Sequence, residues 1–165
     1  MAATNFLSEK DIVIIAYGET KNELRSGKTA TELSADVMVQ LLAKTGLTNR
    51  DIDGFALTLP LSETGFPWYS NVVVENLGIQ ARWLQITDIG GCAILGNVAR
   101  AAAALKCGMI EMAFCIHADA PSRLPAVEYF NYRSEFQEPV GYQGPLIAFG
   151  LMTDAYDQKL SLIHI

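Results

Sequence analysis

The chain has 165 residues, of which half are hydrophobic and 18% are charged, with 12 lysines and arginines against 18 aspartates and glutamates. The net charge of −6 argues against a nucleic-acid binder, which needs a basic face, and the apolar content argues against a disordered chain. No apolar run is long enough to span a membrane, and residues 1–6 lack the features of a secretion signal. We therefore expect a globular cytoplasmic protein.

The cysteines indicate the same compartment. Cys92, Cys107 and Cys115 are odd in number and form no CxxC pair. Such a pattern predicts neither a disulfide framework nor a structural zinc site, and it fits a reducing compartment. We expect no bound metal and no resident cofactor.

The first third of the chain alternates between predicted strands and helices. Ile12–Ala16 is β-branched and predicts a buried strand. Thr29 followed by Glu32 forms a capping box that begins a helix, and Gly46 ends that helix. A second strand is predicted over Phe55–Leu59, where Pro60 follows and ends it.

The alternation continues along the rest of the chain. The next predicted elements are a helix over Pro67–Gly78, a strand over Trp83–Thr87, a helix over Cys92–Lys106, a strand over Ile110–Ala118 and a helix from Pro145 to Tyr156. This order predicts an α/β fold with a mostly parallel sheet and crossover helices. Residues 122–142 are aromatic and irregular, and we expect an excursion or lid there, in which Arg123, Tyr129 and Tyr132 are solvated or packed.

The predicted helix over Cys92–Lys106 is unusually apolar. Between Ala93 and Leu105 only Asn97 and Arg100 are strongly polar, and most other side chains are small. A helix that is apolar nearly all round belongs in a protein interior. A buried central helix is uncommon in so short a chain, so we expect the chain to be part of a larger, truncated fold.

Cys92 is the candidate catalytic residue. It follows Gly90 and Gly91 at the start of the apolar helix, where free amides and the helix dipole stabilise a thiolate and can hold an oxyanion. The alternative is a small buried side chain, which is common for unpaired cysteines. His117 and the aromatic residues around Trp68 are expected to pack in the interior, and Cys107 and Cys115 to be structural.

Several segments together resemble the thiolase superfamily, in its lipid-transfer (sterol-carrier) branch. They are Ile14–Thr20, Thr45–Leu47, Asp51–Gly54, Thr87–Ala93 with its alanine-rich helix and Lys106–Gly108, and Pro139–Tyr142. The likeness extends to about residue 159 and is carried by the order and spacing of these pieces.

The resemblance implies a thiolase-like layered α/β fold of which this chain is the N-terminal half. Residues 1–120 would form the α/β domain and 121–159 the start of a loop domain, while 160–165 resemble a translated sequencing adapter and are expected to be non-native. The implied reaction is acyl transfer with an acyl-CoA substrate, by Claisen condensation or thiolysis, with Cys92 carrying the acyl group. A homodimer is also implied. The catalytic histidine and second cysteine of thiolases have no counterpart here, so this fragment alone is expected to be inactive.

Two other functions remain open. Some relatives in the lipid-transfer branch cleave carbon–carbon bonds by a retro-aldol reaction without this nucleophile, usually beside a small partner subunit. A non-catalytic acyl-CoA-binding subunit is the other alternative. It is favoured by Ile94 and Leu95, which are bulky where thiolases have small residues after the nucleophile.

Overall fold

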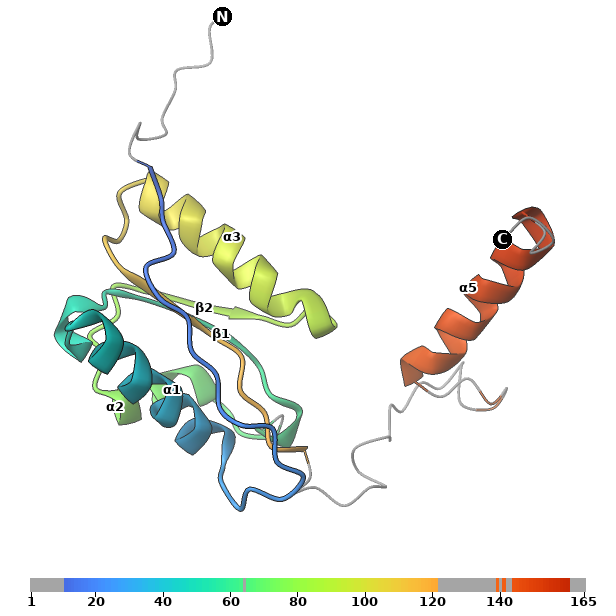
Figure 1. The fold of residues 1–165 in the computed structure, drawn as a ribbon, viewed down its shortest axis with the longest axis horizontal. Helices are drawn as coiled ribbons and strands as arrows, with labels where there is room; N and C mark the ends of the chain where they lie inside the picture. The colour runs from blue at the N-terminus through green and yellow to red at the C-terminus, as the bar shows by residue number, and fades with distance from the viewer. Residues whose placement is uncertain (1–10, 64, 122–138, 140, 142–143, 161–165) are drawn as a thin grey trace, which may run out of the picture. The chain divides into compact units, whose positions relative to one another are not determined.

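The computed structural model describes residues 11–63, 65–121, 139, 141 and 144–160. The chain divides into two compact units, Met1–Arg123 and Leu124–Ile165. The first contains a parallel sheet with helices on both sides (Figure 1). Of the second, the structure describes mainly α5, Gly144–Leu160.

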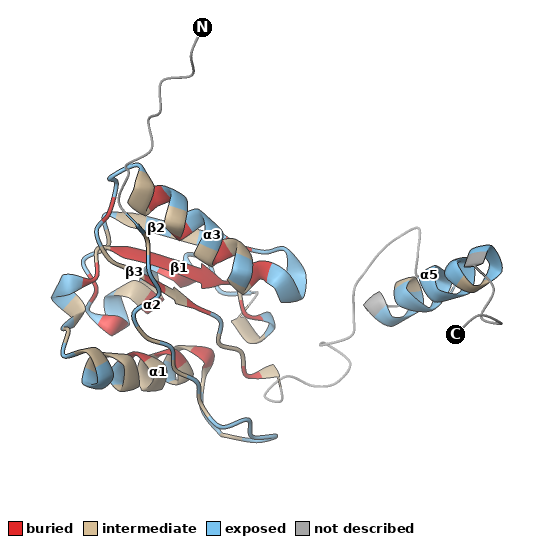
Figure 2. Cartoon of the chain, turned by 45° about the horizontal axis from the view of Figure 1, so that its top comes forward, coloured by how far each residue is buried: buried red, intermediate tan, exposed pale blue. Residues whose placement is uncertain are grey.

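The sheet has three parallel strands in the order β2-β1-β3. They are β1 (Gly54–Thr58), β2 (Trp83–Thr87) and β3 (Ala113–Ile116). In register, Thr58 lies opposite Thr87, and Leu57 lies opposite both Ile86 and Ile116. The central strand is buried along its whole length, as Figure 2 shows. The predicted α/β fold with a parallel sheet is confirmed.

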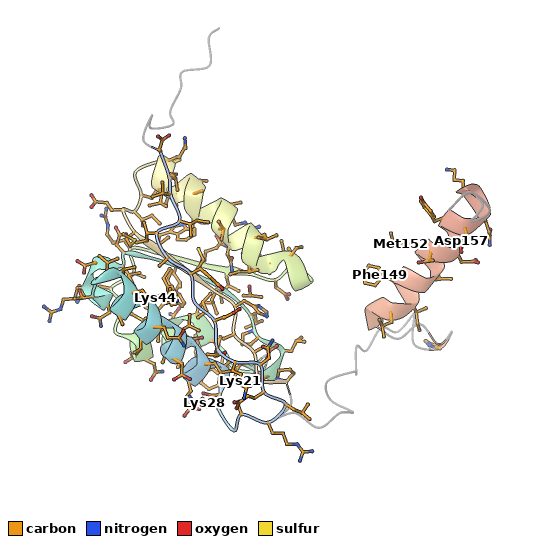
Figure 3. The ribbon with its side chains drawn as sticks, in the orientation of Figure 1. Lys21, Lys28, Lys44, Phe149, Met152 and Asp157 are labelled. Atoms are coloured by element: carbon orange, nitrogen blue, oxygen red, sulfur yellow. The ribbon has the colours of Figure 1, made fainter. Side chains whose placement is uncertain are left out.

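Helices α1 (Ala30–Thr45) and α2 (Tyr69–Leu77) lie on one side of the sheet. The predicted capping box of α1 is present, because Thr29 Oγ1 accepts from the Glu32 amide at 3.1 Å and the Glu32 carboxylate accepts from the Thr29 amide at 2.7 Å. Gly46 ends α1 in the left-handed conformation at φ 72°, as predicted. Lys28 pairs with Asp36 beside the start of α1, and Lys44 lies near its other end (Figure 3).

The main hydrophobic core lies between the sheet and these two helices. Its members on the strands and helices include aromatic and aliphatic side chains from both layers: Met38, Phe55, Leu57, Tyr69, Val73, Leu77, Phe114 and Ile116. The rings of Phe55 and Phe114, which are in register, lie 5.7 Å apart. Burial of these side chains is the main stabilising term of the unit.

Helix α3 (Ala93–Lys106) covers the opposite side of the sheet and is preceded by a short 3-10 turn, η3 (Gly90–Cys92). Its buried face consists of Ala93, Asn97, Ala101 and Ala104, and the small side chains of the three alanines let the helix approach the strands closely. The other face is exposed, and Leu95 is 71% accessible. The helix is therefore buried on one face and not all round, because among the described residues only the sheet side supplies a packing layer.

The predicted strand over Ile12–Ala16 does not form, and that prediction is wrong for this structure. Val13 and Ile14 are 70% and 77% exposed. A strand needs a neighbour that supplies ladder hydrogen bonds, and among the described residues no backbone hydrogen bond joins this segment to a strand. It is held instead at its end, where the Tyr17 carbonyl accepts from Lys44 Nζ at 3.0 Å.

Strand β3 is shorter than the predicted Ile110–Ala118. The amides of Glu111 and Met112 donate to the Asp53 carboxylate, at 3.0 Å and 2.9 Å to Oδ1, so these donors are used before the ladder begins.

Within the described ranges, no helix is both long and apolar enough to cross a membrane.

Candidate active site

Three loops meet at the carboxyl edge of the sheet. They are residues 59–68 after β1, 88–92 after β2 and 117–121 after β3. In open parallel sheets, ligands bind at this edge, beyond the strand ends. The sequence-predicted Cys92 lies here, on the loop between β2 and α3.

The turn before Cys92 is tight and open to solvent. Gly90 has φ 69°, which only glycine adopts without strain, and a Cβ placed on Gly91 would meet nothing within 4 Å. Cys92 is exposed and caps α3 with its backbone. On the inner side, a Cβ on Gly96 would approach Ile89 Cδ1 to 3.0 Å, so α3 packs closely on this loop and fixes it.

The sulfur of Cys92 has one hydrogen-bond partner among the described residues. Its Sγ donates to the Ile89 carbonyl oxygen at 3.2 Å, so the thiol points back to its own turn. A cysteine nucleophile needs a base or a cation to form its thiolate. No such group contacts Cys92 in the described part of the chain. The predicted position of Cys92 is confirmed, and its catalytic role stays a prediction.

His117 was expected in the core, and that prediction is wrong. β3 ends at Ile116, so His117 lies in the loop beyond it and is exposed. The error arose because the apolar run was taken to continue as strand. His117 thereby joins Cys92 at the carboxyl edge as a second group capable of proton transfer.

Two polar pairs connect α3 to the strand ends. Asn97 is fully buried, and its Nδ2 donates to Thr58 Oγ1 at 3.3 Å. Arg100 donates to Thr87 Oγ1. Both acceptors are the last residues of neighbouring strands. The sequence signal for these pairs was that Asn97 and Arg100 are the only strongly polar residues between Ala93 and Leu105, but the pattern did not reveal their partners.

Asp119 ties the loop after β1 to the loop after β3. Its carboxylate accepts from the amides of Leu61 at 2.9 Å and Ser62 at 3.1 Å. The Ser62 hydroxyl in turn accepts from the Ala120 amide at 3.3 Å. This reciprocal arrangement holds the two loops in one geometry.

Replacing Asp119 with alanine should lower the free energy of unfolding by about 1–3 kcal/mol, because two amides lose a charged acceptor. Urea denaturation of the full chain measures the loss. Asp88→Ala, which removes an exposed carboxylate from the loop after β2, is the matched control and should change stability little. Equal stability of both variants would show that the Asp119 hydrogen bonds do not hold the loops.

The two other cysteines differ in exposure. Cys107 is exposed at the end of α3, so it is not packed in the core. Cys115 is in β3, and burial raises its pKa to about 11. Cys115 therefore has the structural character expected of it, as a protonated thiol within the sheet.

Alkylation of the native chain with iodoacetamide at pH 8 should modify Cys92 and Cys107 and leave Cys115 intact. With a pKa of about 11, only about one Cys115 thiol in a thousand is ionised at pH 8, and only thiolates react. Peptide mapping by mass spectrometry locates the modified residues, and denatured protein provides the fully alkylated reference. Early modification of Cys115 would contradict its burial.

Some predicted features lie outside the described residues, namely Arg123, Tyr129 and Tyr132 in the excursion and the tail 161–165. Among the residues that the structure does describe, no group of three or more histidine, cysteine or acidic side chains is placed to hold a metal ion.

Comparison with known proteins finds two aldolases that the chain resembles. No family model matches the chain. A steroid side-chain-cleaving aldolase of Thermomonospora curvata is 27% identical over 144 residues, which are 87% of this chain and 33% of that protein. The solved structure of the Ltp2-ChsH2 (DUF35) aldolase matches with a TM-score of 0.66 and 22% identity, over 83% of this chain and 35% of the solved chain.

The structural match confirms the layered α/β fold. The sequence match shows that the chain is similar to an enzyme of steroid side-chain cleavage. The chain spans about a third of the length of each of these two proteins.

Proposed function

We propose that the chain belongs to a carbon–carbon lyase that cleaves the side chain of a steroid thioester by a retro-aldol reaction. The observation that carries this proposal is the similarity to a steroid side-chain-cleaving aldolase along 87% of the chain. The match in fold to a second aldolase supports it. We prefer a lyase reaction to the acyl transfer that the thiolase resemblance implied, because both matching proteins are aldolases and neither is an acyltransferase.

The reaction requires a base and a stabilised enolate. A base takes the proton of a β-hydroxyl, the bond between the α and β carbons breaks, and a ketone leaves. The electron pair moves onto the α carbon and the thioester oxygen, and a proton from the site or solvent completes the acyl thioester. The retro-aldol reaction is redox-neutral, so it requires neither an oxidant nor a resident cofactor.

The turn at Gly90–Cys92 suits the enolate. Amides at the start of a helix point outward and carry partial positive charge, and such donors stabilise a developing oxyanion. α3 provides a helix start at the carboxyl edge of the sheet, and the open space beside Gly90 and Gly91 gives a thioester access to it. His117 at the same edge is our candidate for proton transfer. In this mechanism Cys92 contributes backbone, and its thiol needs no activation.

Acyl transfer through Cys92 is the second candidate function. The exposed sulfur after two glycines favours it. The hydrogen bond from Sγ to the Ile89 carbonyl favours the lyase, because it turns the sulfur toward its own turn. We also propose that the protein acts with a small partner subunit, because the matching solved structure contains a second, DUF35 component. We further propose that the chain forms a homodimer and that its substrate is an acyl-CoA thioester.

Substitution of Cys92 distinguishes the two functions. In the protein expressed from its complete gene, Cys92→Ala should retain cleavage of a β-hydroxyacyl-CoA within about threefold. A thioester-forming nucleophile, by contrast, contributes several orders of magnitude in rate. Cys107→Ala is the matched control, since it removes another exposed thiol at the far end of α3. Loss of all turnover in Cys92→Ala alone would favour acyl transfer, and binding of acyl-CoA with no turnover in any variant would favour a non-catalytic subunit.

A further inference from the structure

Trp68 combines three unfavourable features at one position. It is the only non-glycine residue with positive φ in the described chain, at φ 56° and ψ 30°. It caps α2 without a side-chain hydrogen bond, at a position where serine, threonine, asparagine and aspartate are favoured. Its indole is 78% exposed, although sequence reasoning expected it to pack. Strain of this kind persists where the surroundings enforce it, and it gathers at ligand sites.

The surroundings of Trp68 do enforce it. The loop before it is built from consecutive turns, with Glu63 donating to the Pro60 carbonyl at 3.1 Å and Phe66 to the Glu63 carbonyl at 2.9 Å. The Asp119 carboxylate anchors the start of this loop. After Trp68, α2 begins at once with the buried Tyr69, whose hydroxyl accepts from Thr31 at 3.3 Å. Hydrogen bonds thus tie the described backbone on both sides of Trp68, while its side chain stays exposed.

The chain segment around Trp68 exposes apolar side chains and contains no basic residue. Phe66 is 50% exposed two residues earlier, and the sequence from Asp51 to Ala81 contains no lysine or arginine. Burial raises the pKa of the neighbouring Tyr69, the hydrogen bond from Thr31 lowers it, and Glu63 and Asp119 raise it further. Exposed aromatic side chains without a cation in the same segment suit an uncharged ring system.

We propose that Trp68, presented at the carboxyl edge of the sheet, stacks against the fused rings of the steroid and sets the preference for ring-bearing substrates. This inference rests on the proposed lyase function for the identity of the ligand. A rigid exposed tryptophan offers a large flat apolar face at little conformational cost. The same residue then explains why a strained and poorly capped helix start is kept.

Binding of progesterone, a neutral steroid, tests the proposal in the protein expressed from its complete gene. Calorimetric titration should give about tenfold weaker binding for Trp68→Ala and a smaller loss for Trp68→Phe, which keeps an aromatic ring. Val39→Ala, on an exposed α1 position, is the control and should bind as the parent does. Adenosine 3′,5′-bisphosphate, the nucleotide part of CoA, should bind equally to all four proteins.

A stability measurement separates binding from a structural role. Trp68→Asn should raise the melting temperature, because asparagine tolerates the left-handed conformation, while it weakens progesterone binding as Trp68→Ala does. Unchanged steroid binding in Trp68→Ala, or weakened binding of the nucleotide alone, would overturn the proposal. Because progesterone binding is measured without turnover, absence of lyase activity with Trp68-dependent binding would refute the proposed function and leave this inference standing.

Discussion

Replacing Asn97 with aspartate should lower the free energy of unfolding at pH 7 by about 4 kcal/mol. Asn97 is fully buried, and its Oδ1 has no hydrogen-bond partner. Burial of a carboxylate at that position would raise its pKa, so it would stay protonated in the fold. With an unfolded pKa of about 3.9, the cost is about 1.4 kcal/mol for each of about three pH units up to pH 7.

The pH dependence gives this prediction its sharpest test. The folded pKa of the new carboxyl is raised, so Asn97→Asp should match the parent below about pH 4 and lose stability as the pH rises. Denaturant unfolding of the full chain at pH 4 and pH 7 measures both. Asn97→Leu, of similar size and without charge, should lack the pH dependence. A pH-independent loss in Asn97→Asp would show that the charge is solvated and that α3 does not seal this site.

Replacing Asp53 with alanine should lower the free energy of unfolding by about 2–3 kcal/mol. The Asp53 carboxylate accepts from the backbone amides of Glu111 and Met112. The backbone carbonyl of Asp53 accepts from the backbone amide of Arg82 at 2.7 Å. Asp53 therefore connects the residues that immediately precede all three strands. The Arg82 guanidinium lies 3.7 Å away but is mostly exposed, so the ion pair adds little.

Asp53→Asn isolates the contribution of the hydrogen bonds, because its amide oxygen keeps one acceptor and should recover part of the loss. Asp11→Ala, at an exposed position, is the control. Thermal and urea unfolding of the full chain give the values. If Asp53→Ala were as stable as Asp11→Ala, the start of β3 would be fixed by the ladder alone and not by the carboxylate.

Local signals predicted most of the fold. The capping box and Gly46 located α1 because these signals act within a few residues, and the runs at Phe55 and Trp83 located β1 and β2. Ile12–Ala16 carried an equally strong strand pattern but does not pair, since pairing depends on a neighbour that the sequence pattern does not specify. The start of β3 was missed because Asp53, almost sixty residues away, accepts the hydrogen bonds of the Glu111 and Met112 amides.

The site was predicted in part. The position of Cys92 at the start of α3 followed from two glycines before an apolar helix. The burial of Asn97 against Thr58, the exposure of His117 and the strained backbone of Trp68 depend on how distant segments meet. Side-chain type and spacing do not specify contacts between distant segments, so the sequence located Cys92 but not these three features.

Product analysis tests the central claim most directly. The protein expressed from its complete gene is incubated with a β-hydroxyacyl-CoA that carries a steroid ring, without added free CoA, and the products are quantified by mass spectrometry. The lyase account predicts a steroid ketone and a shortened acyl-CoA in equal amounts. No cleavage of this substrate, together with CoA-dependent thiolysis of the corresponding 3-oxoacyl-CoA, would contradict it.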